Sequence, residues 1–171
     1  MPTPKPSSTM TPQAFRDAMS TVVSPVAVAT AMDGSRPHGT TVSAFVSLSL
    51  TPPMVLVSLA NGSRLLAVIR RTGRLGLNIL GAHQADLAIA FARSGPDKFD
   101  GVTWLPSQDR PRLPGSAAWI AAEAGDYVTA GDHTVLLAHV LTAEPGEGDP
   151  VSPSPLTYHQ RSFGTHTPLA Y

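Results

Sequence analysis

Short runs of β-branched and apolar residues, each closed by a turn signal, follow one another along most of the chain. The dipeptides Asp-Gly at 33–34 and Asn-Gly at 61–62 are typical of tight turns between strands. Thr-Pro-Pro at 51–53 ends a strand, because proline cannot donate to a sheet ladder. The expected strands lie at 25–30, 39–50, 54–60, 75–80, 102–105, 117–127, 133–144 and 156–159. Many strands joined by tight turns predict a mostly β protein built as an antiparallel barrel.

A few short helices are expected between the strands. The first begins at Pro12, because Thr11 is a favourable cap and proline fits the first helical position. Leu65, Leu66 and Ile69 predict a second helix of one to two turns that ends at Gly73. A third is expected over 84–93, where apolar residues lie among helix-favouring alanines.

The length of 171 residues suits one domain with one hydrophobic core. We expect a disordered N-terminal arm at 1–11, the domain itself at 12–164, and a C-terminal tail at 165–171. Within the domain, residues 145–155 are rich in Pro, Gly and Ser and predict a linker.

The charge composition restricts the partners of this chain. Twelve basic residues balance twelve acidic ones, so no broad positive field exists to bind nucleic acid. Charged residues make up 14% of the chain, against about 25% in a typical soluble domain, which favours a surface partly buried in an oligomer. No apolar run is long enough for a membrane helix and the N-terminus is not signal-like, so a cytoplasmic location is expected.

Several chemistries lack their motifs here. The chain has no cysteine, which excludes disulfides, thiolate nucleophiles and cysteine–metal sites. Its histidines show no metal-ligand spacing, Ser43 lacks the GxSxG elbow, and no glycine-rich dinucleotide or phosphate loop follows a strand. We therefore expect neither a catalytic metal nor a Rossmann domain.

Three segments carry candidate binding groups, and each has a plainer interpretation. The hydroxyl side chains of 39–49 suit a polar ring edge or a phosphate at a barrel rim, or a half-buried strand whose polar face meets water. Ser63 and Arg64 precede a helix and suit a phosphate, or a capping serine beside a solvated arginine. His133 follows a Gly-Asp turn and suits a donor at the barrel mouth, or a surface histidine at a strand end.

In their order along the chain, these segments resemble the short-chain flavin reductase family, the reductase components of two-component flavin-dependent monooxygenases. The resemblance covers about residues 12–164. It is carried by PVAVAT at 25–30, DG at 33–34, GTTVSAF at 39–45, SLSLTPP at 47–53, VLVSL at 55–59, NIL at 78–80, FA at 91–92, Phe99, GDH at 131–133 and PLTY at 155–158.

This resemblance implies an antiparallel split β-barrel and a homodimer, with FMN or FAD bound near the dimer interface. It implies hydride transfer from NADH or NADPH to the flavin, with the reduced flavin diffusing to a partner monooxygenase. Since a flavin carries the redox chemistry, the protein itself needs no acid, base or metal.

The resemblance also implies the site residues. Those expected to edge the isoalloxazine ring are Thr41, Val42, Ser43 and Ala44. Those expected to approach the flavin through backbone groups are Ser58, Leu59 and Ala60. Those expected at the phosphate or ribityl chain are Ser47, Ser63 and Arg64. Asn78 and Phe91 are expected to shape the pocket, and Phe99 to cover it. Tyr158 and Arg161 lie where the family's C-terminal segment approaches the site. His133 matches the histidine that positions the nicotinamide nucleotide.

Two features depart from the family pattern. Arg64 stands where a small hydroxyl residue is common, and because arginine can bind one phosphate or a diphosphate, FMN and FAD both stay open. The segment from Gly164 onward has no counterpart. Two alternatives to a reductase remain, a flavin-binding electron carrier and a biosynthetic enzyme that reuses the scaffold.

Overall fold

The computed structural model of the chain describes residues 10–146 and 154–170. This part is mostly β, with antiparallel strand pairs and three short α-helices, as the sequence predicts. Most of the expected arm at 1–11 and part of the expected linker at 145–155 lie outside the described residues. No helix in the described ranges is long and apolar enough to cross a membrane.

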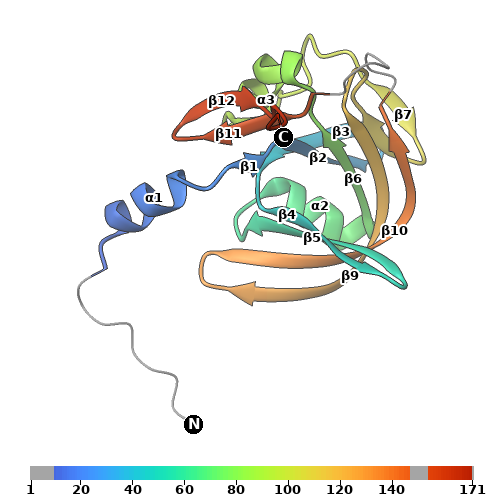
Figure 1. Cartoon of the computed structure of the whole chain (residues 1–171). Helices are drawn as coiled ribbons and strands as arrows, with labels where there is room; N and C mark the ends of the chain where they lie inside the picture. Colours follow the sequence, from blue (N-terminus) through green and yellow to red (C-terminus); the bar gives the residue numbers. More distant parts are fainter. Residues whose placement is uncertain (1–9, 147–153, 171) are drawn as a thin grey trace, which may run out of the picture.

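The main sheet has seven strands in the order β3-β2-β6-β9-β10-β5-β4 and curls round on itself (Figure 1). Its strands are β2 (Ala27–Asp33), β3 (Arg36–Val42), β4 (Phe45–Leu50), β5 (Pro53–Ala60), β6 (Arg74–Ile79), β9 (Ala118–Ala130) and β10 (His133–Pro145). The two edge strands, β3 and β4, are consecutive in the chain. The backbone between them crosses from one edge to the other, and Ser58 N donates to Ala44 O at 2.9 Å.

Helix α2 (Arg64–Thr72) fills the space enclosed by this sheet. Its apolar stripe, Leu65, Leu66, Val68 and Ile69, is buried with Val57, Leu59, Leu77 and Leu136 of the strands. Ser63 caps the helix by accepting from Leu66 N at 3.4 Å, and Gly73 ends it at φ 72°, where only glycine is unstrained. The predicted second helix and its glycine stop are confirmed.

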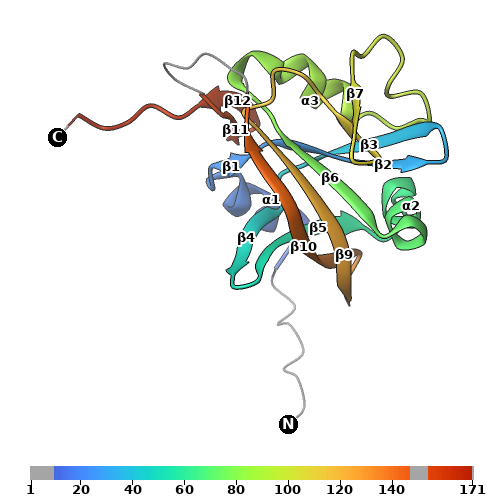
Figure 2. The same ribbon diagram turned by 90° about the vertical axis from the view of Figure 1, so that its right-hand side faces the viewer.

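A second layer lies on the other side of β2 and β3. It contains α3 (Ala85–Ala92), the 3-10 turn η1 (Ala82–Gln84) and two small sheets. One sheet is formed by β1 (Ser24–Pro25), β11 (Leu156–His159) and β12 (Ser162–Thr165), and the other is the hairpin of β7 (Leu105–Ser107) and β8 (Arg110–Arg112). Figure 2 shows α2 and α3 on opposite sides of the β2–β3 hairpin. Val28, Leu80, Phe91 and Leu156 form its core, which is separate from the core around α2.

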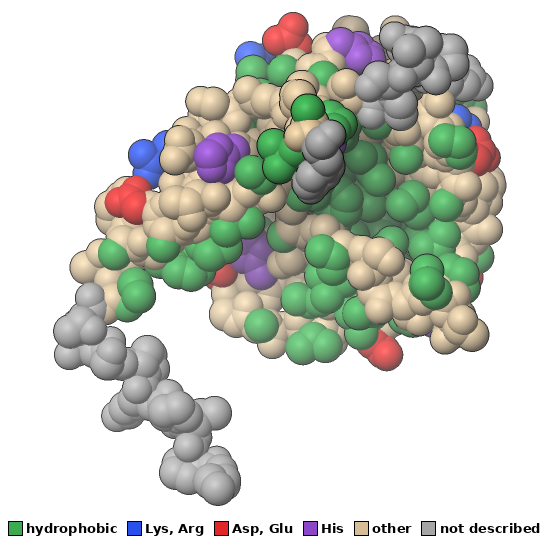
Figure 3. All heavy atoms as spheres, viewed as in Figure 1, with side chains coloured by type: hydrophobic (Ala, Val, Ile, Leu, Met, Phe, Trp, Pro, Cys, Tyr) green, Lys and Arg blue, Asp and Glu red, His purple; other side chains and the backbone are tan. Residues whose placement is uncertain are grey.

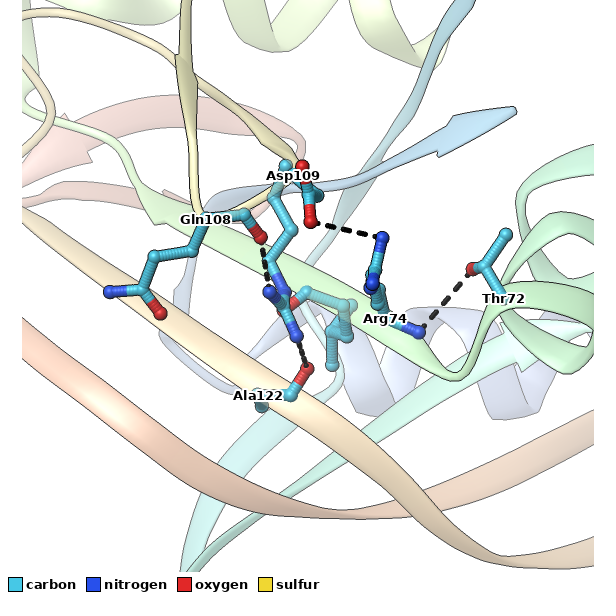
Figure 4. A network of polar contacts seen from close by, with 7 residues as sticks. Thr72, Arg74, Gln108, Asp109 and Ala122 are labelled. Atoms are coloured by element: carbon cyan, nitrogen blue, oxygen red, sulfur yellow. Dashed lines mark hydrogen bonds and ion pairs between the residues drawn. The ribbon is translucent and has the colours of Figure 1, made fainter. Parts of the chain in front are cut away.

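The segment after α3 differs from the expected single strand at 102–105. Its strands are β7 (Leu105–Ser107) and β8 (Arg110–Arg112), a hairpin that is fixed by the buried Arg110. The Arg110 guanidinium donates to Gln108 O, to Ala122 O at 2.8 Å and to Leu75 O at 3.0 Å (Figure 4). Burial lowers the pKa of Arg110, and three backbone carbonyls replace the water that its charge loses. No periodic pattern in the sequence marks such a contact.

Two other boundaries correct the sequence-based expectations. The expected strand at 39–50 is two strands, because the chain leaves β3 at Val42 and enters β4 at Phe45. After β11 (Leu156–His159), a further strand β12 (Ser162–Thr165) pairs back on β11. Gln160 and Arg161 make its turn with φ of 47° and 63°, without glycine, so the turn carries no signal in the sequence.

Helix α1 (Pro12–Ser20) projects from the body of the molecule (Figure 1). Thr11 caps it through Ala14 N at 3.1 Å, as expected. An ion pair joins Asp17 to Arg161 at 2.5 Å, but α1 has no buried residue and its apolar stripe faces solvent. The helix therefore has no packing partner within the described part of its own chain.

Candidate functional site

Three adjoining hollows form one groove beside the break between β3 and β4. The ring hollow, about 240 Å³, is lined by 40–44, 58–60, Ser63 and His133. It shares Thr40, Ala60 and Ser63 with the cationic hollow, about 460 Å³, whose basic residues are Arg64, Arg93 and Lys98. It shares Thr41 and Ser43 with the apolar hollow, about 510 Å³, which reaches Tyr158 and Phe163.

The ring hollow exists because the chain leaves the sheet for two residues. Ser43 and Ala44 belong to no strand, so their backbone borders the hollow. The end of β5 forms the opposite wall, with Ser58 and Ala60 on its outer side and Leu59 turned into the core. The Thr41 hydroxyl donates to Ala88 O at 2.6 Å and ties this wall to α3.

His133 begins β10 and pairs with Ala60 of β5, which places it at the mouth of the ring hollow. Its Nδ1 lies 2.8 Å from Asp132 Oδ1, and the side chain is about half exposed. The hydrogen bond to His133 lowers the pKa of Asp132. Since Asp132 holds Nδ1, the remaining ring nitrogen, Nε2, is the one available to a ligand.

Asn61 fixes the turn that carries His133. Its backbone N donates to Asp132 O at 2.9 Å, and its Nδ2 donates to Gly131 O at 3.2 Å. Its Oδ1 accepts from the Thr134 hydroxyl at 2.8 Å. The β9–β10 turn is thereby joined to the β5–α2 turn, which carries Ser63. The sequence indicates only a turn at Asn61, so this role was missed.

The groove brings most of the expected residues together. Those that line it are Thr41, Val42, Ser43, Ala44, Ser58, Leu59, Ala60, Ser63, Arg64, Phe99, His133, Tyr158 and Arg161. Those that line none of the three hollows are Ser47, Asn78 and Phe91.

The three exceptions have separate structural reasons. Ser47 lies on the edge strand β4, paired with Val55 and exposed. Phe91 is fully buried behind β3, where its ring would lie 2.8 Å from a Cβ added at Gly39. Asn78 is also fully buried, and its side chain hydrogen-bonds backbone groups of Val28, Pro111 and Leu113 inside the molecule. It supports the fold rather than the groove.

Arg93 and Lys98 line the cationic hollow and were not expected there. Lys98 Nζ donates to Phe91 O at 2.8 Å, and burial lowers the pKa of this lysine. His38 lines the same hollow, and its Nε2 is buried without a hydrogen-bond partner among the described residues. The sequence contains one signal that could have indicated this role of Lys98. It is one of only two lysines in the chain, and it directly precedes the motif residue Phe99.

Comparison with known proteins identifies the scaffold. A family model described as the flavin reductase like domain matches residues 19–167. The chain belongs to this family. Among the described residues, no group of three or more His, Asp or Glu side chains is placed to hold a metal ion.

Curated relatives of this flavin reductase-like protein include two oxidoreductases. The reductase component of a 4-nitrophenol 4-monooxygenase/4-nitrocatechol 2-monooxygenase from Rhodococcus opacus is 38% identical, over 90% of this chain and 80% of its own. An NADH:riboflavin 5′-phosphate oxidoreductase from Streptomyces pristinaespiralis is 37% identical, over 92% of this chain and 89% of its own.

Solved structures agree with the fold. A nitrilotriacetate monooxygenase component B homologue from Mycobacterium thermoresistibile superposes with a TM-score of 0.85 at 29% identity, covering 93% of this chain and 91% of its own. An NADH:FAD oxidoreductase from Streptomyces globisporus, solved with NAD and FAD fragments, superposes with a TM-score of 0.84 at 26% identity, covering 93% of this chain and 94% of its own.

Proposed function

We propose that this protein transfers hydride from NADH or NADPH to FMN or FAD bound in the groove. The observation that carries the proposal is the continuity of the ring hollow with a cationic hollow on one side and His133 at its mouth. A flavin has a planar polar-edged ring joined to an anionic tail, and the two hollows offer a site for each part. The family and the relatives support the same activity.

The residues of the ring hollow hold the cofactor and orient it. A bound flavin supplies the redox chemistry by accepting hydride. The backbone at 43–44 and the outer side of β5 border the ring edge, where amide groups can hydrogen-bond its polar atoms. Ser63 and Arg64, at the N-terminus of α2, bind the phosphate nearest the ring.

His133 and the apolar hollow position the nicotinamide nucleotide. His133 Nε2 hydrogen-bonds the nucleotide at the ring hollow, and Asp132 keeps the imidazole in that orientation. Tyr158 and Arg161 border the space next to it, on the β11–β12 hairpin. Hydride transfer requires the donor carbon and the acceptor nitrogen to lie about 3–3.5 Å apart, so orientation is the main task of these residues.

The flavin phosphate site can be tested at Arg64. Arg64→Ala is expected to weaken FMN binding about 10-fold or more, because a charge-assisted hydrogen bond to phosphate is lost. Riboflavin, which lacks the phosphate, is expected to bind the variant as it binds the wild type. Fluorescence titration with both flavins measures the difference. Equal losses for FMN and riboflavin would show that Arg64 acts through packing instead.

An apolar stripe on the outer side of the main sheet favours a split barrel that forms a homodimer. Residues Val46, Leu56, Leu137, Val135 and Val128 lie on the outer side of β4, β5, β10 and β9, where strand pairing aligns them in one apolar stripe. Figure 3 shows hydrophobic side chains gathered on this side of the molecule. Exposed apolar area of this kind favours association, and α1 supplies more of it. The stripe runs toward His133, so the partner copy borders the groove.

The dimer is expected to be stable at working concentrations. Light scattering across the micromolar range is expected to give a mass near twice 17.9 kDa. Val46→Glu, which puts a charge at the half-exposed edge of the stripe, is expected to shift the mass toward the monomer. A mass of 17.9 kDa for the unsubstituted protein at every concentration would contradict the dimer.

The reduced flavin passes by diffusion to a partner monooxygenase. Two relatives are named as reductase components or subunits of monooxygenases, and each matches at least 90% of this chain. Because nicotinamide nucleotides are retained inside the cell, we place the reaction in the cytoplasm.

The proposed domain spans residues 12–165. The boundary expected from the sequence, residue 164, is moved by one residue so that the domain includes the whole of β12.

One relative favours a second candidate function. An actinorhodin polyketide dimerase from Streptomyces coelicolor is 38% identical, over 74% of this chain and 72% of its own. A biosynthetic enzyme on this scaffold, or an electron carrier, would hold its flavin through turnover. Gel filtration of the reduced protein separates these cases, because a reductase of the diffusing type releases its flavin and the other two retain it.

A further inference from the structure

The cationic hollow contains basic side chains that form no ion pair with a carboxylate among the described residues. The arginines that pair with carboxylates are Arg36, Arg71, Arg74, Arg112 and Arg161. Arg64, Arg93 and Lys98 have no such partner in the described ranges, and no Asp or Glu lines their hollow. In a chain with equal numbers of acidic and basic residues, three unpaired cations in one hollow indicate an anionic ligand.

These cations stand on two walls. Arg64 begins α2 on one wall, beside the capping Ser63. Arg93 and Lys98 belong to the segment after α3 on the other wall. Two hydrogen bonds hold the Lys98 ammonium there, to Phe91 O at 2.8 Å and to Thr40 Oγ1 at 3.4 Å. Burial lowers the pKa of Lys98, and an anion beside the ammonium would offset this cost of desolvation.

The hollow is larger than a single phosphate requires. Its volume of about 460 Å³ is in the range of sites that enclose a whole small molecule, roughly 300–1,000 Å³. Phe99 also lines it, and its ring is held edge-on to Phe91 at 4.8 Å between centroids. A fixed aromatic ring beside cations suits a base joined to a diphosphate.

We infer that the cationic hollow binds the ADP half of FAD, so that this chain prefers FAD to FMN. The inference rests on the proposed function, because it takes the ring hollow as the flavin site. The phosphate nearest the ring meets Ser63 and Arg64, as in FMN. The second phosphate meets Arg93 and Lys98, and the adenine lies against Phe99.

Dissociation constants for FAD, FMN and riboflavin test this assignment. The wild type is expected to bind FAD at least about 10-fold more tightly than FMN, the effect of one added charge-assisted hydrogen bond. Arg93→Ala and Lys98→Met are each expected to weaken FAD about 10-fold and FMN less than about 3-fold. Arg74→Ala is the control, because Arg74 is half-exposed, pairs with Asp109 and lines none of the hollows.

Two results would overturn the assignment. One is equal affinity of the wild type for FAD and FMN. The other is equal loss of both flavins in Arg93→Ala, which carries the test if Lys98→Met does not fold, since Arg93 is exposed. In either case, NADH oxidation with FMN would leave the proposed function standing. Absence of oxidation with every flavin would instead defeat the proposed function, whatever the affinities.

Discussion

Replacing His133 with alanine is expected to raise the KM for the nicotinamide nucleotide about 5- to 150-fold. That range corresponds to losing a hydrogen bond worth about 1–3 kcal/mol. His133 stands at the mouth of the ring hollow with Nδ1 held by Asp132, so only its Nε2 faces a ligand. The dissociation constant for flavin is expected to change little, because the residues proposed for phosphate binding lie at the N-terminus of α2 and in the segment after α3. A modest fall in kcat accompanies the change if the ring also aligns the nicotinamide.

Two further variants sharpen this test. Asn61→Ala keeps the imidazole but removes the side-chain hydrogen bonds that hold its turn, so a smaller rise in KM is expected. His166→Ala is the matched control, because His166 is exposed and lines none of the three hollows. Steady-state kinetics at saturating flavin, beside a flavin titration of each variant, give the comparison. A loss of flavin affinity with no change in the nucleotide KM would assign His133 to the flavin instead.

Replacing Asn78 with alanine is expected to lower the free energy of unfolding by about 3–5 kcal/mol. The Asn78 amide Nδ2 lies 3.2 Å from Val28 O and 3.3 Å from Pro111 O, and Oδ1 accepts from Leu113 N at 2.7 Å. Alanine leaves these backbone groups buried without a partner, because the residue is fully enclosed. The side chain therefore joins β2 and β6 to the segment around β8.

Chemical denaturation measures this loss, and flavin titration below the transition separates it from a role in binding. The folded variant is expected to bind flavin as the wild type does, since Asn78 lines none of the hollows. Ser47→Ala, at an exposed position of β4, is expected to change stability by less than about 0.5 kcal/mol. If Asn78→Ala kept its stability and lost flavin affinity, the expectation from the sequence motif would be restored.

The sequence predicts the elements of the main sheet well because their signals are local. The cap at Ser63, the left-handed Gly73 and the Gly-Asp turn before His133 each act within a few residues, and the structure has all three. The class of fold follows from these signals together with alternating strands. The turn at Gln160 and Arg161 takes left-handed backbone without glycine, so β12 gave no such signal.

Site residues are harder to predict because they depend on which segments meet in space. Thr41 and Ser58 belong to two of the motifs that carry the resemblance, and both line the ring hollow. Their contact with a flavin stays a prediction. Asn78 also belongs to a motif, but a motif does not separate a residue that lines a site from one that supports it. Arg93 and Lys98 reach the groove because the segment after α3 borders the same hollow as the start of α2. That contact is tertiary, and no periodicity in the sequence records it.

Oxidation of NADH and NADPH by the purified protein, with FMN, FAD and riboflavin added in turn, tests the central claim most directly. Absorbance at 340 nm follows the nucleotide, and a flavin-free sample is the control. Turnover is expected to depend on a flavin, either added or already bound. The residues that line the groove are binding groups, and none of them is itself a redox group. Undetectable turnover with every flavin and both nucleotides would contradict the assignment of this protein as a flavin reductase.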